Sequence, residues 1–187
     1  MADIFTVGVV GSGIMGGGLA EVASRAGYEV VLRSRTTSAA QAALSGLTAG
    51  LDKQVAKERL ADDERDAILR RITTTDRLAD LSDCDLVIES VVEDLTVKQA
   101  LFADLDRIAK PSALLATNTS TLSVTTIAAS TSRPVQVCGI HFFNPAPVMK
   151  LVEIVRALTT GDETIQRAVE FAERCGKQAI VVEDHAG

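Results

Sequence analysis

Apolar and polar positions follow two different periods along the chain. Seven short runs rich in Val, Ile and Leu are bounded by turn residues, which is typical of buried strands. Between them, apolar residues recur three and four positions apart, which indicates amphipathic helices. The runs predict strands over residues 5–10, 29–33, 85–89, 114–116, 135–140, 152–155 and 178–182. The amphipathic stretches predict helices over residues 14–25, 38–59, 62–71, 97–109 and 162–174. This alternation predicts an α/β fold, a mostly parallel sheet with helices on both faces.

The length and charge of the chain narrow the classes of protein. It has 187 residues, which suits one domain with a core of its own, and a formal net charge of -6. Lys and Arg form no dense cluster, so neither a nucleic acid nor a membrane surface is expected as a partner. No apolar run reaches the length of a membrane span. The first residues, MADIFTVGVVG, lack the features of a signal peptide, so a cytoplasmic protein is expected.

The three cysteines are Cys84, Cys138 and Cys175. They are odd in number, widely spaced, without a CxxC pair and without a nearby His. We therefore expect reduced cysteines that act as small apolar side chains, and no metal site.

A glycine-rich turn directly follows the first predicted strand and opens the first predicted helix. Its residues are Gly11, Ser12, Gly13, Ile14, Met15 and Gly16, in the pattern G-x-G-x-x-G. Gly11 allows the tight turn, Gly13 lets the backbone approach a pyrophosphate, and Gly16 lets the helix pack close to the sheet. Free N–H groups at the helix start then face the anion. The turn predicts a Rossmann-type domain that binds a nicotinamide dinucleotide; the alternative is a glycine-rich turn without a ligand.

The end of the second predicted strand bears on the choice of cofactor. Enzymes that use NAD usually place an acidic residue there for the ribose 2′-hydroxyl. This chain has Arg33, Ser34 and Arg35 instead. Because guanidinium groups bind phosphate in a bidentate way, NADP(H) is expected to be favoured over NAD(H). The alternative is a solvated loop with relaxed cofactor choice.

A histidine and a glutamate on neighbouring apolar runs are candidates for acid–base chemistry. His141 ends a buried strand, where α/β enzymes place catalytic groups. Glu153 lies in the next apolar strand, where a carboxylate needs a partner. A carboxylate that accepts a hydrogen bond from an imidazole fixes its tautomer and favours a general base. The alternatives are a core histidine with satisfied hydrogen bonds and an edge-strand glutamate that faces solvent.

Five segments resemble, in the same order, the N-terminal domain of L-3-hydroxyacyl-CoA dehydrogenases, especially the bacterial 3-hydroxybutyryl-CoA dehydrogenases. They read GSGIMGGGLA, DLVIESVVEDLTVK, LLATNTSTL, GIHFFNPAPVMKLVEIV and GKQAIVVEDHAG. They span nearly the whole chain, and HFFNP followed by LVE is more specific than the glycine motif. The resemblance implies a reversible, NAD(P)-dependent oxidation of a (3S)-3-hydroxyacyl-CoA, such as 3-hydroxybutyryl-CoA, to a 3-oxoacyl-CoA.

The resemblance also implies roles for individual residues. His141 matches the catalytic base, and Glu153 the group that orients it. Ser120 matches the residue that hydrogen-bonds the substrate oxygen, and Asn144 a polar group near the nicotinamide. Further matches are Glu93 and Lys98 as cofactor contacts, and Lys57 and, less securely, Lys53 as contacts of the CoA phosphates. All four of these charged residues could instead be ordinary solvated helix charges. Ser34 stands where the family has an acidic residue, in keeping with a preference for NADP(H).

The family continues beyond the closing motif with an all-helical C-terminal domain. That domain carries a further catalytic Asn, completes the acyl-CoA cleft and forms the dimer. Residues 1–187 are therefore expected to be a dinucleotide-binding domain cut before it, and the complete enzyme to be a homodimer. Two other functions stay open: a related dehydrogenase acting on a free or carrier-protein-bound 3-hydroxy acid, and a dinucleotide-binding module without turnover.

Overall fold

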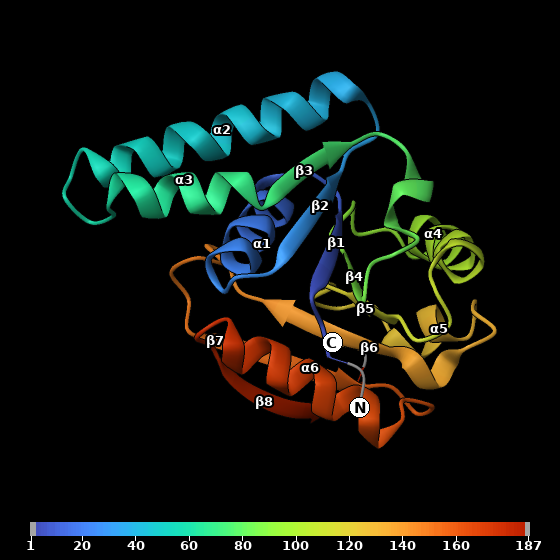
Figure 1. The fold of residues 1–187 in the computed structure, drawn as a ribbon. Helices are drawn as coiled ribbons and strands as arrows, with labels where there is room; N and C mark the ends of the chain where they lie inside the picture. The colour runs from blue at the N-terminus through green and yellow to red at the C-terminus, as the bar shows by residue number, and fades with distance from the viewer. Residues whose placement is uncertain (1–2, 186–187) are drawn as a thin grey trace.

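The computed structural model describes residues 3–185, which form one sheet flanked by helices (Figure 1). The strands are β1 Thr6–Val10, β2 Glu29–Arg33, β3 Ile72–Thr75, β4 Leu86–Glu89, β5 Leu114–Thr117, β6 Val137–Phe142, β7 Leu151–Arg156 and β8 Gln178–Glu183. The helices are α1 Ile14–Arg25, α2 Thr37–Val55, α3 Asp62–Arg70, α4 Leu95–Ile108, α5 Val124–Ala128 and α6 Asp162–Arg174, with two short 3-10 helices at Leu78–Leu81 and Pro134–Gln136. The predicted domain, 1–187, extends beyond the described residues by two residues at each end.

The eight strands lie in the order β3-β2-β1-β4-β5-β6-β7-β8. All neighbours are parallel except β6 and β7, which pair antiparallel. The chain runs from β1 outward to β3 and then returns to β4 on the other side of β1. The carboxyl ends of β1 and β4 therefore flank the point where the strand order reverses, which is where α/β sheets bind ligands.

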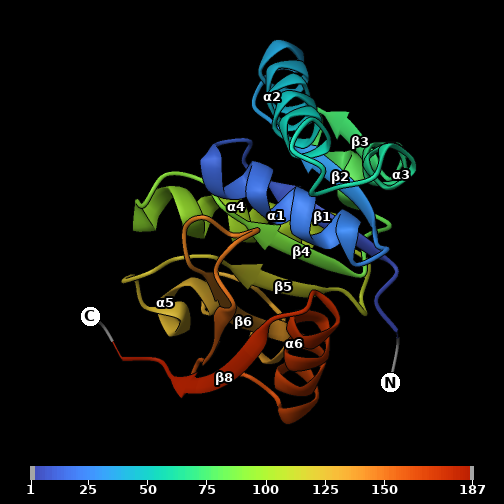
Figure 2. The ribbon, with the colours of Figure 1, turned by 90° about the vertical axis from the view of Figure 1, so that its left-hand side faces the viewer.

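The sheet separates two apolar cores because successive side chains of a strand point to opposite faces. One core is formed with α1, α2, α3 and α6 and takes Leu86 and Ile88 of β4. The other is formed with α4 and α5 and takes Val87 of the same strand. Both faces of the central strands are covered, which explains why these strands are apolar at nearly every position. Figure 1 shows α1 and α4 on opposite sides of this layer, and in Figure 2, turned by 90°, α1 lies on the side that faces the viewer.

The predicted α/β fold is confirmed, and every predicted strand and helix is present. The elements at 14–25, 29–33 and 162–174 have the predicted bounds, and the others have shifted ends. One strand and one α-helix were missed, besides the two short 3-10 helices. β3 reads ITTT and has one fully buried residue, Ile72, so it lacks the apolar run that marks the other strands. α5 has five residues, too few for a helical period to appear. The helix predicted over 38–59 ends at Val55, and Glu58 has a positive φ of 54° that reverses the chain.

The amino-terminal edge of the sheet is held by a carboxylate just before β4. Asp85 accepts hydrogen bonds from the backbone N–H groups of Phe5 and Thr6, both at 2.9 Å, and from Nζ of Lys110 at 2.6 Å. Burial alone raises the pKa of Asp85, but these donors outweigh it and lower the pKa. Asp85 is thus a structural carboxylate at the edge opposite the glycine-rich turn.

The cysteines are free thiols. Cys84 and Cys138 are buried, Cys175 is half-buried, and burial raises the pKa of each thiol to about 12. Thiols with such a pKa are not nucleophiles at neutral pH. Within residues 3–185 no group of His, Cys, Asp and Glu side chains could hold a metal ion. No helix in this range is long and apolar enough to cross a membrane.

Candidate active site

The glycine-rich turn joins β1 to α1 at the carboxyl edge of the sheet. Gly11 has a φ of 111°, and a Cβ there would lie 2.2 Å from the carbonyl oxygen of Ser90. A Cβ on Gly16 would lie 1.9 Å from the carbonyl oxygen of Gly11. Around Gly13, by contrast, a Cβ would meet nothing within 4 Å. Two glycines thus let the chain fold on itself, and the third leaves its surface open.

The first turn of α1 has N–H groups available for an anion. Gly13 is its N-cap and provides no side-chain hydrogen bond, and the first turn contains no acidic residue. The leading N–H groups of a helix lack intrahelical acceptors and carry the positive end of the helix dipole. The surface next to Gly13 therefore suits a pyrophosphate on chemical and steric grounds.

The end of β2 contains a buried hydroxyl without a partner. Ser34 is 2% exposed, and its Oγ makes no hydrogen bond to any described residue. Such a group costs free energy unless a ligand or water satisfies it. Arg33 is half-buried and its Nε donates weakly, at 3.4 Å, to the carbonyl oxygen of Asp76, whereas Arg35 is exposed. Of the two arginines, Arg33 is therefore partly held by the protein, and only Arg35 extends into solvent.

Asp76 is a carboxylate at this edge that the sequence reading missed. It follows β3 and accepts a hydrogen bond of 2.6 Å from Oγ1 of Thr37, at the start of α2. That hydrogen bond, with a smaller effect of the Arg33 charge, lowers the pKa of Asp76. The sequence could have indicated Asp76 only if β3 had been predicted. In the parallel pair of β2 and β3, Thr75 is the register partner of Arg33, so residue 76 lies beside the end of β2. An acidic group thus lies near Ser34 although none follows β2 in the sequence.

His141 and Glu153 form a hydrogen-bonded pair across two strands. They are direct register partners in the antiparallel pair of β6 and β7, so both side chains point to the same face. Nδ1 of His141 lies 2.8 Å from Oε2 of Glu153. The His141 side chain is 15% exposed and that of Glu153 is 30% exposed. Since a carboxylate accepts, this hydrogen bond favours the proton on Nδ1, and in the neutral imidazole Nε2 is then the acceptor.

The loop after His141 is held from two directions. Oδ1 of Asn118, after β5, accepts a 2.8 Å hydrogen bond from the backbone N–H of Phe142. Nζ of Lys177 donates to the carbonyl oxygens of Ala146, at 2.6 Å, and Met149, at 2.9 Å. Asn144 is exposed between these anchors. The loop that carries Asn144 is therefore fixed at both of its ends while the Asn144 side chain faces outward.

Glu93, Lys98 and Ser120 belong to one polar network. Nζ of Lys98 donates to Oε2 of Glu93 at 3.2 Å, and the backbone N–H of Ser120 donates to Oε1 of Glu93, also at 3.2 Å. Burial raises the pKa of Glu93, but the hydrogen bond from Thr119 and the Lys98 charge outweigh it and lower the pKa. Lys98 is only 1% exposed, so it is not a solvated helix charge. Ser120 itself is exposed.

The two lysines considered for CoA lie apart from this network, at the α2–α3 turn. Lys53 is in the last turn of α2, and Lys57 follows the end of the helix. Both are exposed. The two helices form a hairpin that projects from one end of the sheet (Figure 1). Among residues 3–185 neither ammonium group has a hydrogen-bond or ion-pair partner, so both can bind a ligand or water.

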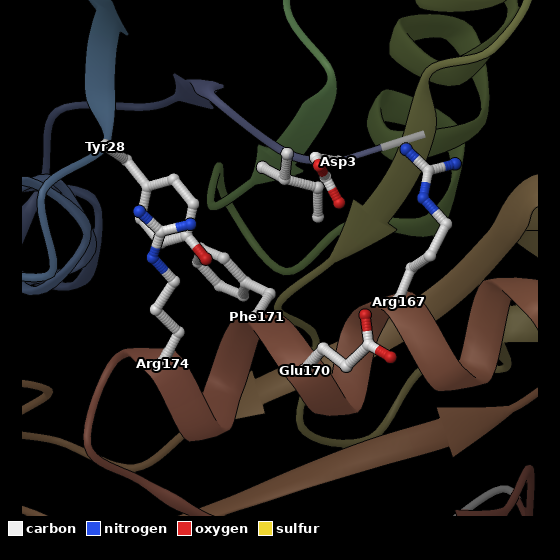
Figure 3. A pocket seen from close by; sticks show the side chains of 7 residues that line it. Asp3, Tyr28, Arg167, Glu170, Phe171 and Arg174 are labelled. Carbon is white, nitrogen blue, oxygen red and sulfur yellow. The ribbon is translucent and has the colours of Figure 1, made fainter. Parts of the chain in front are cut away.

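A shallow hollow at the opposite edge of the sheet contains none of these residues. Figure 3 shows it between α6 and the residues that precede β1 and β2. Its walls carry two cations and two carboxylates; the lining residues are Asp3, Ile4, Tyr28, Arg167, Glu170, Phe171 and Arg174. The Arg174 guanidinium lies 4.6 Å from the centre of the Tyr28 ring, and burial raises the pKa of Tyr28 to about 12. With balanced charges, and away from the helix start, this hollow does not suit a dinucleotide.

Comparison with known families identifies the fold. Residues 6–185 match the model of the family described as 3-hydroxyacyl-CoA dehydrogenase, NAD binding domain. The chain belongs to the 3-hydroxyacyl-CoA dehydrogenase family. The glycine-rich turn, the His141–Glu153 pair and the Ser120 loop all lie inside the matched NAD-binding domain, at or next to the carboxyl edge of its sheet.

Two curated relatives are named 3-hydroxybutyryl-CoA dehydrogenase. The protein of Mycobacterium tuberculosis strain H37Rv is 45% identical over 190 residues, which cover 100% of this chain and 66% of the relative. The protein of Bradyrhizobium diazoefficiens is 42% identical over 183 residues, which cover 98% of this chain and 62% of the relative. The chain thus spans just under two thirds of these members of the 3-hydroxyacyl-CoA dehydrogenase family.

Solved structures of the family have the same fold. The crystal structure of 3-hydroxybutyryl-CoA dehydrogenase from Escherichia coli K12 has a TM-score of 0.96 and 42% identity over 98% of this chain and 39% of that one. The (S)-3-hydroxybutyryl-CoA dehydrogenase of Ralstonia eutropha also has a TM-score of 0.96, with 36% identity over 98% of this chain and 65% of that one. The described residues therefore form the N-terminal, dinucleotide-binding part of this dehydrogenase family.

Proposed function

We propose that this chain is the cofactor-binding part of an enzyme that reversibly oxidises (3S)-3-hydroxyacyl-CoA, with 3-hydroxybutyryl-CoA as the expected substrate, to 3-oxoacyl-CoA. One observation carries the proposal. A histidine that hydrogen-bonds a carboxylate at 2.8 Å lies at the same sheet edge as a glycine turn open to a pyrophosphate. A base and a dinucleotide site at one edge of the sheet are what oxidation of a secondary alcohol requires.

His141 is the proposed general base. With Nδ1 bound to Glu153, Nε2 takes the proton from the substrate hydroxyl as the C–O double bond forms. A nicotinamide dinucleotide held at the Gly11–Gly16 turn would supply the oxidising chemistry, since it would accept the hydride from C3. Glu153 stabilises the resulting imidazolium and holds the ring in one tautomer. In the reverse direction His141 returns the proton, so the same pair serves as the acid.

Ser120 and Asn144 are proposed to position the reacting carbon. Both are exposed and follow strands of the same edge, β5 and β6. The Ser120 hydroxyl would hydrogen-bond the substrate oxygen, and the Asn144 amide would lie beside the nicotinamide. Together they would align the C3 hydrogen for transfer. Glu93 and Lys98 are proposed to contact the cofactor, and the free ammonium groups of Lys53 and Lys57 the CoA phosphates.

NADP(H) is the proposed preferred cofactor. The unpartnered Ser34 hydroxyl and the exposed Arg35 guanidinium would bind a 2′-phosphate, with Arg33 beside them. Asp76 opposes this preference, because its carboxylate repels phosphate and can accept from a ribose hydroxyl instead. Fluorescence titrations of the chain with NADPH and NADH show which of the two cofactors binds more tightly. NADH binding more tightly than NADPH contradicts the preference without touching the proposed reaction.

The reaction is tested by oxidation of NAD(P)H with acetoacetyl-CoA. The assay is run on this chain and on a polypeptide that covers the full length of the relatives. In that longer polypeptide, an all-helical C-terminal domain is proposed to complete the acyl-CoA cleft and to form the homodimer. The complete enzyme is proposed to be cytoplasmic. His141→Ala is expected to lower turnover at least about a hundredfold in the longer enzyme. Near-normal turnover of that variant overturns the assignment. Dinucleotide binding without turnover in both proteins favours a binding module.

A further inference from the structure

Glu89 is a fully buried carboxylate to which the proposed reaction gives no role. It ends β4, a strand whose other residues are apolar, and its exposure is 0%. An ionised group in such a position is unfavourable unless it is paired and hydrogen-bonded. The carboxylate therefore requires a structural explanation.

Three donors surround Glu89, and they come from three different segments. Its Oε1 accepts from Nζ of Lys98 in α4 at 2.6 Å and from the backbone N–H of Val91 at 2.7 Å. Its Oε2 accepts from Oγ1 of Thr117, at the end of β5, at 2.7 Å. The carboxylate thus fixes the start of the loop after β4, the first turns of α4 and the end of β5 relative to one another.

The network continues from Glu89 to Ser120. Lys98 divides its ammonium group between the buried Glu89 and the partly exposed Glu93. Glu93 in turn accepts from the Thr119 hydroxyl and from the backbone N–H of Ser120. A displacement of Lys98 would release Glu93, and with it the loop that carries Ser120.

The position of the network in the sheet indicates which half of a dinucleotide it serves. The turn at Gly11–Gly16 would hold the pyrophosphate, and the end of β2 would hold the adenosine ribose. The nicotinamide half must then lie on the other side of β1, over the carboxyl ends of β4 and β5. Glu89 and Thr117 are the last residues of those two strands.

Resting on the proposed function, we infer that Glu89 is a positioning residue for the nicotinamide end of the site. It touches neither cofactor nor substrate. It neutralises the buried Lys98 and holds Lys98, Glu93 and the Ser120 loop in the one arrangement that receives the nicotinamide. The adenosine end, built on β1 and β2, does not depend on it.

The test compares two ligands that differ only in the nicotinamide. Glu89→Gln is titrated with NADH and with ADP-ribose, which lacks that ring, or with their 2′-phosphorylated forms if wild type binds those more tightly. We expect about tenfold weaker binding of the nicotinamide ligand, in line with the loss of a charged hydrogen bond, and unchanged binding of ADP-ribose. The emission of bound NADH is expected to shift toward that of the free form.

Asp85→Asn is the matched control. Asp85 precedes the same strand, also accepts three hydrogen bonds, and also pairs with a lysine, but at the opposite edge. It is expected to lower thermal stability without changing either affinity. Equal losses in both variants, or NADH binding within twofold of wild type in Glu89→Gln, overturn the inference while leaving the proposed function intact.

A second variant covers the case in which Glu89→Gln does not fold. Thr117→Val keeps both charges and removes the hydroxyl that donates to Oε2 of Glu89. The same hydroxyl accepts, at 3.3 Å, from the backbone N–H of Thr119 in the Ser120 loop, so the variant loosens the network at both contacts. It is expected to weaken NADH binding about threefold, with ADP-ribose again unchanged. Unchanged NADH binding overturns the inference. If wild type binds neither ligand, the proposed function itself fails, and this outcome is distinct from the others.

Discussion

The two halves of the sheet's carboxyl edge recognise ligands by different means. The half formed by β1 and α1 relies on backbone: two glycines that tolerate no side chain, a third that leaves open space, and helix N–H groups. The half formed by β4, β5, β6 and β7 relies on side chains that meet from distant segments, such as His141 with Glu153 and Glu89 with Thr117. The backbone half is thus formed by residues close together in the sequence, and any added side chain disturbs it. The side-chain half depends instead on strand register and on charge.

The side-chain half is tested most severely by removing the charge that orients His141. Glu153→Gln keeps the size of the side chain but no longer stabilises an imidazolium. In an enzyme of the relatives' full length, turnover is expected to fall about a hundredfold, with dinucleotide affinity unchanged. The measurement is steady-state oxidation of NAD(P)H together with a binding titration. Glu183→Gln, on the exposed edge strand β8, is the control and is expected to keep full turnover.

The opposite outcome would also be informative. If Glu153→Gln weakened dinucleotide binding as much as turnover, the pair would act on the cofactor rather than on the proton. The two halves would then not be separable, and the comparison between them would be wrong.

The backbone half is tested by adding one methyl group. Gly16→Ala places a Cβ 1.9 Å from the carbonyl oxygen of Gly11, so the turn must move. The free energy of unfolding is expected to fall by at least about 2 kcal/mol, as for overpacked sites, and dinucleotide binding is expected to be lost. Gly50→Ala in α2 is the control, because its Cβ meets nothing within 4 Å. It is expected to gain about 0.5–1 kcal/mol from helix propensity. Chemical denaturation measures both, and equal stability of the two variants would contradict the steric argument.

The sequence predicted these two halves to different extents, for a physical reason. The glycine turn is recognisable because its function depends on six consecutive residues. The His141–Glu153 pair was also predictable, since each residue lies in an apolar strand that has to satisfy it. Asp76 was not, because it reaches the site only through β3, a Thr-rich strand without an apolar run. Glu89 ends an apolar strand, and that signal could have identified it, but its partners lie 9 and 28 residues further along the chain.

A smaller effect is expected for Asp76, which lies next to the backbone half, at the end of β3. Asp76→Asn removes a negative charge beside Arg33 while keeping an acceptor for the Thr37 hydroxyl. NADPH affinity is expected to rise about three- to fivefold relative to NADH, which is modest because the group is exposed to solvent and screened. Parallel titrations of wild type and variant provide the ratio. Asp80→Asn, also exposed at this end of the sheet, is the control; an unchanged ratio in Asp76→Asn would exclude an effect of Asp76 on cofactor choice.

The smallest expected effect concerns acid stability at α5, the helix that follows the Ser120 loop of the side-chain half. Asp184, after β8, accepts hydrogen bonds from the Ser123 hydroxyl and from the backbone N–H groups of Val124 and Thr125, and so fixes the start of α5. Burial raises the pKa of Asp184, but these hydrogen bonds outweigh it, and the pKa lies below its usual value of 3.8.

A depressed pKa in the folded state sets the sign of the pH dependence. The unfolded chain binds the proton first as pH falls, so this contribution to stability is complete above about pH 5 and is lost as pH falls through the folded pKa. The melting temperature of Asp184→Asn is expected to lie about 2–4 °C below wild type at pH 7 and to approach that of wild type as the pH falls below 3.8. Thermal melts at several pH values measure this difference. If the difference in melting temperature stays constant from pH 7 to pH 3, the charge of Asp184 does not stabilise α5. The stability of this part of the molecule would then depend on steric fit, as that of the glycine turn does.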